Sequence, residues 1–276
     1  MKFRIIFSIV YAVILMTALS SCKSEFERVR TSNDPVLLLE QANKYFDNGK
    51  YLNAQTLYDI AIPYYRGKAE SEDLFYKYAY TYYHTEDYIL AAHYFKNFAS
   101  SFINSSKREE AAYMSAYSEY LMSPIPALDQ TYTNKAIESL QYFVNNYPNS
   151  DKIEQCNKLL DELRLKLEEK SFSEGMLYFK TKQYVSAVTS FENMLNDFPE
   201  SSRAEEVRYL VVQAGYLYSI NSIYDKREER LTDAYNKYNA FIRKYPQSKY
   251  SAKVKKIGLE IEKNLNEYKH GKGHQS

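Results

Sequence analysis

The chain has 276 residues, of which 45% are hydrophobic and 26% charged, with a formal net charge of +1 at pH 7. There are 36 basic and 35 acidic residues, so removal of a leader containing Lys2 and Arg4 would leave a charge of −1. This balance lacks the excess of lysine and arginine that is typical of proteins that bind nucleic acids. Seven glycines and seven prolines are few for this length, which argues against glycine-rich phosphate loops and turn-dense β folds and favours long helices.

Residues 1–21 are typical of a lipoprotein signal peptide. Lys2 and Arg4 precede fifteen mostly apolar residues at 5–19. A transmembrane helix needs roughly 20 apolar residues, whereas the apolar region of a signal peptide takes about 7 to 15. We therefore expect this segment to be absent from the mature protein.

The sequence LSSC at 19–22 closes the apolar run and resembles a lipobox, in which the cysteine receives a diacylglyceryl group and becomes the first residue. The alternatives for Cys22 are a core position or half of a disulfide. The second cysteine, Cys156, occupies an apolar position in a helical pattern, so we expect a buried free thiol there and no disulfide. We predict lipidation of Cys22, a charged tether over 22–34, and anchoring by more than one acyl chain.

Five units in one register follow, and they resemble the tetratricopeptide (TPR) pattern of paired helices. Each unit has an alanine followed four residues later by an aromatic residue or leucine. In three units an aromatic-proline-x-serine phrase lies at the end, at 147–150, 198–201 and 245–248. Proline ends a helix and serine is a favoured N-cap, so each phrase predicts a helix end and the cap of the next helix. A helical bundle without repeats is the alternative, but the shared register favours repeats. The alanines are Ala54, Ala91, Ala136, Ala187 and Ala234.

These units predict an all-α fold, an elongated superhelical stack of five TPR-like helix pairs. Units one to three occupy 35–149. The segment 150–268 holds units four and five, and it begins with a proline-free stretch that predicts one helix of about thirty residues between units three and four. Insertions are expected at 123–130, where two prolines force a loop, and at 221–230. The polar residues 269–276 predict a disordered tail.

No pattern of catalytic or metal-binding residues stands out. The four histidines include no HExxH pair and none lies beside cysteines at zinc spacing. Nucleophile elbows, phosphate loops and dinucleotide fingerprints are also missing from the sequence. We therefore expect no enzymatic activity, no metal and no cofactor, which leaves the 30 tyrosines as candidates for a binding surface.

The tyrosines of 74–84 cover more than one face of a helix. One stripe should be core and the other, by TPR geometry, should face a groove; Tyr78 and Tyr82 form the stripe assigned to the core. Tyrosine suits peptide binding because it offers a large apolar ring and a polar tip at little cost in rotamer entropy. Ordinary packing aromatics and a sugar-stacking platform are the alternatives. The predicted peptide-binding residues are Asn43, Phe46, Tyr76, Tyr80 and Tyr83.

The lipobox, the repeats and the proline-rich phrase 123–133 leading into 135–143 together resemble the BamD family, most closely its Bacteroidetes members. BamD proteins are lipoproteins of the outer-membrane β-barrel assembly machinery. The resemblance implies a non-enzymatic protein anchored in the outer membrane on the periplasmic side. It implies that the C-terminal units bind a BamA-type subunit and that the N-terminal groove receives unfolded barrel precursors.

A second reading is a periplasmic TPR scaffold lipoprotein that organises envelope or peptidoglycan enzymes. Proteins of that kind use similar repeat ends but place a coiled coil before about three repeats and lack the anchor. Surface glycan capture also combines a lipid anchor with TPR units, but in much longer chains. Acidic residues after the cysteine can direct such lipoproteins to the cell surface, and 23–25 is only partly acidic, so we expect the periplasmic side.

Overall fold

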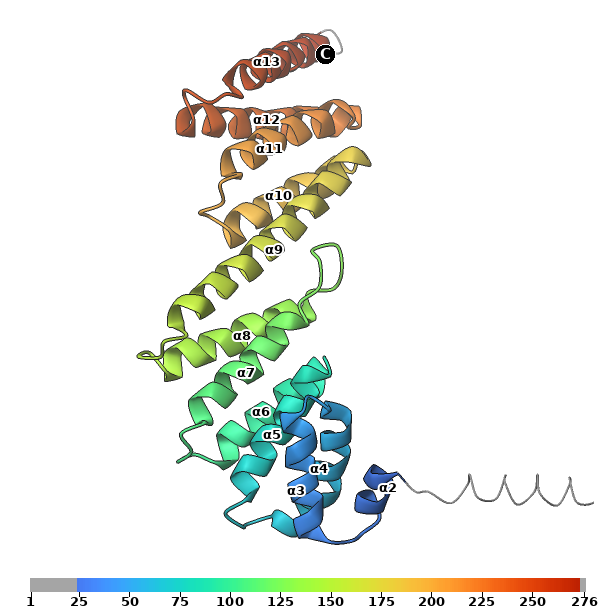
Figure 1. The fold of residues 1–276 in the computed structure, drawn as a ribbon. Coiled ribbons are helices and arrows are strands. Elements are labelled where there is room, and N and C mark those ends of the chain that lie inside the picture. The colour runs from blue at the N-terminus through green and yellow to red at the C-terminus, as the bar shows by residue number, and fades with distance from the viewer. Residues whose placement is uncertain (1–23, 274–276) are drawn as a thin grey trace, which may run out of the picture. The chain divides into compact units, whose positions relative to one another are not determined.

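The computed structural model describes residues 24–273, and within them the chain forms twelve helices and no strand (Figure 1). Consecutive helices pack against each other in pairs, as the TPR pattern predicts. The all-α fold class is thereby confirmed. The helices are α2 (Glu25–Arg30), α3 (Pro35–Asp47), α4 (Tyr51–Tyr65), α5 (Ser71–His84), α6 (Tyr88–Ser101), α7 (Arg108–Leu121), α8 (Thr131–Asn146), α9 (Ile153–Lys180), α10 (Tyr184–Asp197), α11 (Ala204–Ile220), α12 (Tyr224–Lys244) and α13 (Ser251–Gly273).

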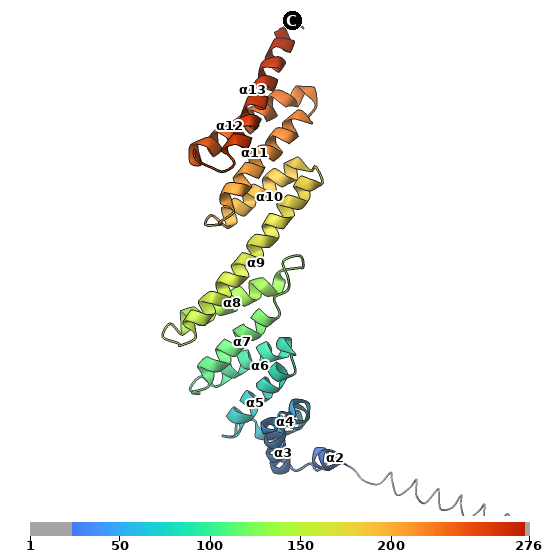
Figure 2. The same cartoon turned by 45° about the horizontal axis from the view of Figure 1, so that its top comes forward.

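The chain divides into two compact units. Unit 1 contains α2 to α8 and the start of α9 as far as Leu160; unit 2 contains the rest of α9, the segment Pro124–Gln130 and α10 to α13 (Figure 2). The boundary therefore falls inside α9, which has 28 residues and is the long helix expected from the proline-free stretch.

The alanine register marks the close contacts inside each helix pair. All five register alanines, Ala54, Ala91, Ala136, Ala187 and Ala234, are 0% exposed. Gly175 serves the same purpose on α9, since a Cβ there would overlap the buried ring of Phe191 on α10. Small residues are required where two helices approach closely, which is why the register could be found from sequence.

The turn inside a helix pair has the same backbone form in three repeats. The second residue after the helix adopts a left-handed conformation: Gly49 at φ 71°, Glu86 at φ 61° and Lys182 at φ 61°. The next backbone N–H then donates to a carbonyl five residues earlier, which closes the preceding helix in the manner of a Schellman cap. These bonds are Lys50 to Tyr45 (2.8 Å), Asp87 to Tyr82 (2.9 Å) and Gln183 to Tyr178 (2.9 Å).

The serines of the turns between pairs have a different role from the predicted N-cap. Ser201 lies two residues before Arg203, the N-cap residue of α11, and accepts the backbone N–H of Arg203 at 3.0 Å. Its hydroxyl donates to Glu168 on α9 at 2.7 Å. Ser105 donates in the same way to Glu72 on α5 at 2.7 Å. The predicted cap of the next helix is therefore wrong at Ser201, because this serine ties the end of a pair back to the first helix of the same pair.

The two insertions take different forms. Pro124–Gln130 is a loop, in which the buried side chain of Gln130 donates to the carbonyls of Ile125 and Leu128, both at 2.9 Å. Lys170 on α9 donates to the same Leu128 carbonyl at 2.9 Å. The second insertion lengthens the flanking helices, since α11 has 17 residues and α12 has 21.

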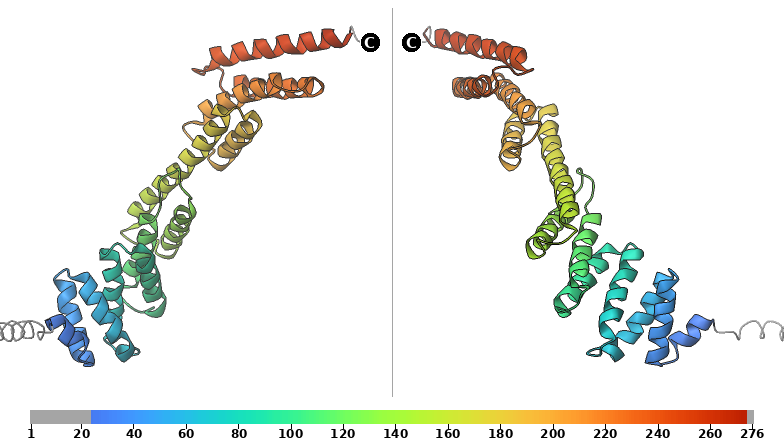
Figure 3. Two further views of the ribbon diagram at one scale, coloured as in Figure 1. Left: turned by 90° about the vertical axis from the view of Figure 1, so that its right-hand side faces the viewer. Right: turned by 60° about the vertical axis from the view of Figure 1, so that its left-hand side comes forward.

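At both ends of the described chain, helices extend into segments for which the sequence predicts no helix. Within the predicted tether 22–34, residues 25–30 form α2, which contacts α3 and α4 (Figure 3). Its Val29 side chain is 6% exposed in the core of unit 1, and Phe26 packs against the same cluster. This part of the segment is therefore docked on unit 1. At the other end, α13 continues to Gly273, into the predicted tail of 269–276. Cys22 and the predicted signal peptide 1–21 lie outside the described residues.

Candidate peptide-binding surface

The five predicted binding residues lie together in unit 1. Asn43 and Phe46 are on α3, and the three tyrosines are on α5, the first helix of the next pair. All five side chains are half-buried, neither sealed in the core nor fully in solvent. We call the set Asn43, Phe46, Tyr76, Tyr80 and Tyr83 the aromatic surface.

A lysine joins the two helices at the Asn43 end of the aromatic surface. Lys77 Nζ donates to Asn43 Oδ1 at 3.1 Å, and Tyr58 donates to the same oxygen at 2.8 Å. Lys77 also lies 3.4 Å from Asp73 and 3.9 Å from Asp47, and its Nζ is 5.7 Å from the centre of the Phe46 ring. The Asn43 amide is thus held by two donors from two different helices.

Stacked rings connect Phe46 to Tyr80. Phe46 meets Tyr51 edge-on at 5.5 Å, and Tyr51 stacks on His84 with ring centroids 4.1 Å apart. His84 lies 5.8 Å from Tyr80. Partial burial lowers the pKa of His84 from its ordinary value of 6.5, so the imidazole is neutral at pH 7 and stacks as an uncharged ring.

Tyr80 lies at the centre of the aromatic surface and is held from both sides. Its ring packs edge-on against the buried Phe95 at 4.8 Å, and its hydroxyl donates to Glu110 at 2.7 Å. Tyr76 lies 5.0 Å away on the same helix. Burial, followed by the bond to Glu110, raises the pKa of Tyr80, and burial raises the pKa of Tyr76 to about 12. Both phenols therefore remain neutral donors at neutral pH.

A carboxylate between two lysines fixes the charge at the Tyr76 end. Lys107 donates to Asp73 at 2.8 Å, and its Nζ lies 4.9 Å from the centre of the Tyr76 ring. Burial alone would raise the pKa of Asp73, but the hydrogen bond from Lys107 and the charge of Lys77 lower it overall. The edge of the surface thus carries compensated charges.

The predicted core stripe of α5 is buried at Tyr78 but not at Tyr82. Tyr78 is 2% exposed and donates to Asp59 at 3.1 Å, which makes it a core residue. Tyr82, assigned to the same stripe, is half-buried and stacks on Tyr94 at 4.9 Å. The assignment of Tyr82 to the core is therefore wrong, because its ring lies at the edge of the contact with α6 and is half-buried like Tyr76, Tyr80 and Tyr83.

Sequence reasoning missed four side chains that complete the aromatic surface. His84 and Tyr51 link its rings, Lys77 holds Asn43, and Glu110 receives the Tyr80 hydroxyl. Only Lys77 had a local signal, its spacing of four residues from Asp73 on one helix face. Glu110 lies 30 residues from Tyr80, so no local pattern reveals that bond.

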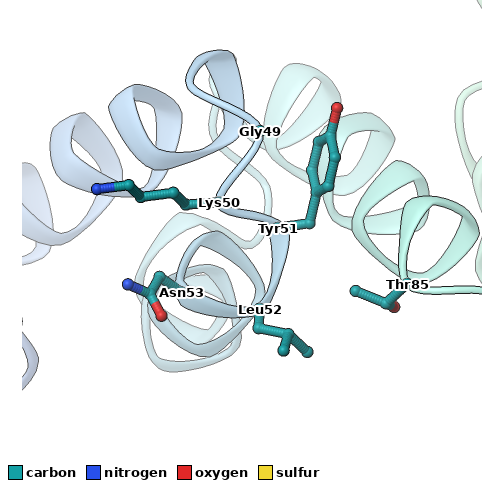
Figure 4. Close-up of a pocket in the computed structure, with 6 residues that line it drawn as sticks. All are labelled: Gly49, Lys50, Tyr51, Leu52, Asn53 and Thr85. Carbon is teal, nitrogen blue, oxygen red and sulfur yellow. The ribbon is translucent and has the colours of Figure 1, made fainter.

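An open hollow lies beside this surface at the turn between α3 and α4. Its volume is about 390 Å³, and Figure 4 shows the residues that line it: Gly49, Lys50, Tyr51, Leu52, Asn53 and Thr85. Across residues 24–273 no group of three or more histidine, cysteine, aspartate or glutamate side chains is arranged to hold a metal ion. The aromatic surface offers aromatic rings, the Asn43 amide and lysine–carboxylate pairs, which are groups that can contact a bound peptide.

Most of the chain matches a known protein family. A family model described as YfiO, outer membrane lipoprotein, matches residues 31–228 and again 179–270. The chain belongs to the YfiO family. This membership confirms the predicted BamD-like family and makes the protein an outer-membrane lipoprotein of the TPR type. Within residues 24–273 of this YfiO-family chain, no helix is both long and apolar enough to span a bilayer.

Other comparisons add little to the YfiO assignment. No curated protein matches the chain. Among solved structures, the crystal structure of the apo form of RapI is similar at 16% sequence identity and a TM-score of 0.30, covering 87% of this chain and 84% of that one.

Proposed function

We propose that this YfiO-family protein is a lipoprotein of the β-barrel assembly machinery on the periplasmic side of the outer membrane. Lipidated Cys22 anchors it, the C-terminal repeats bind a BamA-type subunit, and the aromatic surface of unit 1 receives unfolded barrel precursors. The observation that carries the proposal is the family membership together with the half-buried rings joined across α3 and α5. The protein acts by binding, with no chemical step.

The aromatic surface has features that suit an extended strand. The final strand of a barrel precursor ends in an aromatic residue and alternates apolar and polar side chains, so one of its faces presents apolar groups every second residue. Tyr76 and Tyr83 offer ring edges to those groups on either side of Tyr80. Asn43 and Lys77 offer polar partners to the strand backbone. A strand held in this way is kept extended until it pairs with the growing sheet.

Each docked aromatic side chain contributes modestly. Burial of apolar surface is worth roughly 25 cal/mol per Å², and an aromatic pair adds about 0.5–1.5 kcal/mol. Ordering of the bound segment opposes part of this gain. We therefore expect weak, reversible binding, which is what transfer of a precursor to the barrel subunit requires.

The partners are tested by purification from membranes. The protein carries a C-terminal tag, membranes are solubilised gently, and copurifying proteins are identified by mass spectrometry, with Cys22→Ala as the matched control. Recovery of a barrel with periplasmic domains, weakened by Cys22→Ala, supports the assembly role. Recovery of peptidoglycan enzymes without such a barrel contradicts it and favours the scaffold function.

A further inference from the structure

Helix α2 determines where the lipid anchor leaves the folded chain. Ser24 caps this helix by accepting the backbone N–H of Glu27 at 3.2 Å. Phe26 meets the Tyr45 ring edge-on at 5.8 Å, and Val29 is buried in the core of unit 1. Because Tyr45 lies in the last turn of α3, the N-terminus of α2 is directed toward the end of unit 1 where α3 turns into α4.

The link between the anchor and α2 is very short. Cys22 precedes Ser24 by two residues, and a chain spans at most about 3.6 Å per residue, so their Cα atoms lie within roughly 7 Å of each other in any conformation. This step rests on the proposed lipidation of Cys22. Since the acyl chains must enter the hydrocarbon, the membrane surface has to approach the same end of unit 1.

The end that the link reaches carries exposed apolar groups. We call Lys50, Tyr51, Leu52, Tyr88 and Ile89, at the two turns inside the helix pairs α3–α4 and α5–α6, the turn edge. Leu52 is 65% exposed and Ile89 is 58% exposed. Lys50 lies with its Nζ 5.8 Å from the centre of the Tyr45 ring, the ring on which Phe26 packs. Tyr45 therefore contacts both Phe26 of α2 and Lys50 of the turn edge. The hollow lined by Leu52 lies in this edge (Figure 4).

The composition of the turn edge fits a phospholipid interface. Tyrosine is enriched at the level of the lipid headgroups, and lysine extends its ammonium to water while its stem lies along apolar surface. The exposed charges nearby give no basic patch, because Lys44 and Lys50 are opposed by Asp47, Glu86 and Asp87. Contact would therefore depend on apolar insertion rather than on attraction to anionic lipid.

We propose that the turn edge of unit 1 lies in the interfacial region of the phospholipid surface that holds the anchor, oriented by docked α2 and its two-residue link. The opposite edge of unit 1 then points away from the membrane. That edge carries Val36 (68% exposed) at the start of α3 and Ile103 (60% exposed) after α6. Tyr65, at the end of α4, donates to the Pro35 carbonyl at 3.2 Å, which places the start of α3 at the end opposite the turn edge.

The test uses tryptophan as a depth probe, because the chain has none. Leu52→Trp and the matched control Val36→Trp are made in the full-length lipoprotein, and circular dichroism verifies folding. The purified proteins are added to phosphatidylethanolamine–phosphatidylglycerol vesicles with brominated acyl chains. We expect at least twofold stronger quenching at 52 than at 36. Equal quenching at the two positions would overturn the proposal.

A longer link provides the second arm. Ten glycine and serine residues inserted after Lys23 span about 16–19 Å as a flexible chain, so the difference in quenching between 52 and 36 should fall by half or more. An undiminished difference would contradict an orienting role for the link. Mass spectrometry of each protein distinguishes the two ways in which the test can fail. Absence of the diacylglyceryl mass would refute lipidation of Cys22, on which the proposed function rests. Presence of that mass with equal quenching would refute only the membrane contact of the turn edge.

Discussion

Gly175→Ala tests how closely the helix pairs approach each other. A Cβ at position 175 would overlap the ring of Phe191, which is 0% exposed. Overpacking of a core costs about 1–3 kcal/mol. Alanine in place of glycine inside a helix stabilises the helix by roughly 1 kcal/mol. We therefore expect Gly175→Ala to lower the free energy of unfolding by up to about 2 kcal/mol.

Gly215→Ala is the matched control in the same unit. Its nearest neighbours would be Lys237 Cδ at 3.5 Å and Ala234 Cβ at 3.8 Å, which is ordinary contact. Only the helix-propensity gain of up to about 1 kcal/mol then applies. Urea unfolding followed by circular dichroism at 222 nm should rank Gly175→Ala below the unmodified protein and Gly215→Ala at or above it.

A second substitution identifies the ring as the cause. Phe191→Leu frees space beside position 175, so it should cost less in the Gly175→Ala background than alone, with a coupling of at least about 0.5 kcal/mol. Equal stability of Gly175→Ala and Gly215→Ala, together with additive effects of Phe191→Leu, would refute the close contact between α9 and α10.

Three further predictions concern single side chains. Because burial lowers the pKa of His84, the unfolded chain binds its proton more readily, so this histidine should reduce stability as pH falls below about 6.5; an NMR titration that places its pKa at or above 6.5 would contradict this. Lys77→Met leaves Asn43 with one donor and should cost about 1 kcal/mol in urea unfolding, against under about 0.5 kcal/mol for Lys158→Met, whose ion pair is exposed. Burial raises the pKa of Cys156 to about 11, so this thiol should react with a disulfide reagent only after unfolding; rapid labelling of the folded protein at pH 8 would show that it is accessible.

The repeat architecture could be predicted because its signals are local and strict. Ala54 and Ala91 are fully buried at contacts that admit only a small side chain, so their spacing appears in the sequence as a register. The long α9 follows from the absence of proline. The role of Tyr78 as a core residue also follows from its position on the same helix face as other buried side chains.

What the sequence could not reveal depends on tertiary partners or on very short elements. Helix α2 has six residues, too few for a hydrophobic period, and its order depends on Phe26 meeting Tyr45. Ser201 matches an N-cap pattern, yet a carboxylate 33 residues earlier takes its hydroxyl. The insertion near residue 221 lengthens two helices, because nothing in its composition breaks them.

The residues of the aromatic surface could be chosen from the sequence, but the contacts that hold them could not. Helix periodicity separates Tyr76, Tyr80 and Tyr83 from the buried Tyr78, and the TPR resemblance adds Asn43 and Phe46. The contacts that hold these side chains in place come from residues of other helices. Lys77 reaches Asn43 across 34 residues, a distance in sequence at which pairing is not visible.

Site-specific photo-crosslinking in living cells tests most directly whether the aromatic surface receives barrel precursors. A photo-reactive phenylalanine analogue replaces Tyr83 in the aromatic surface or, as the control, Tyr142, which is 63% exposed on α8. We predict crosslinks from position 83 to newly made outer-membrane barrel proteins and few or none from position 142. Equal labelling from the two positions, or crosslinks from position 83 only to peptidoglycan enzymes, would contradict the proposal that this surface receives barrel precursors.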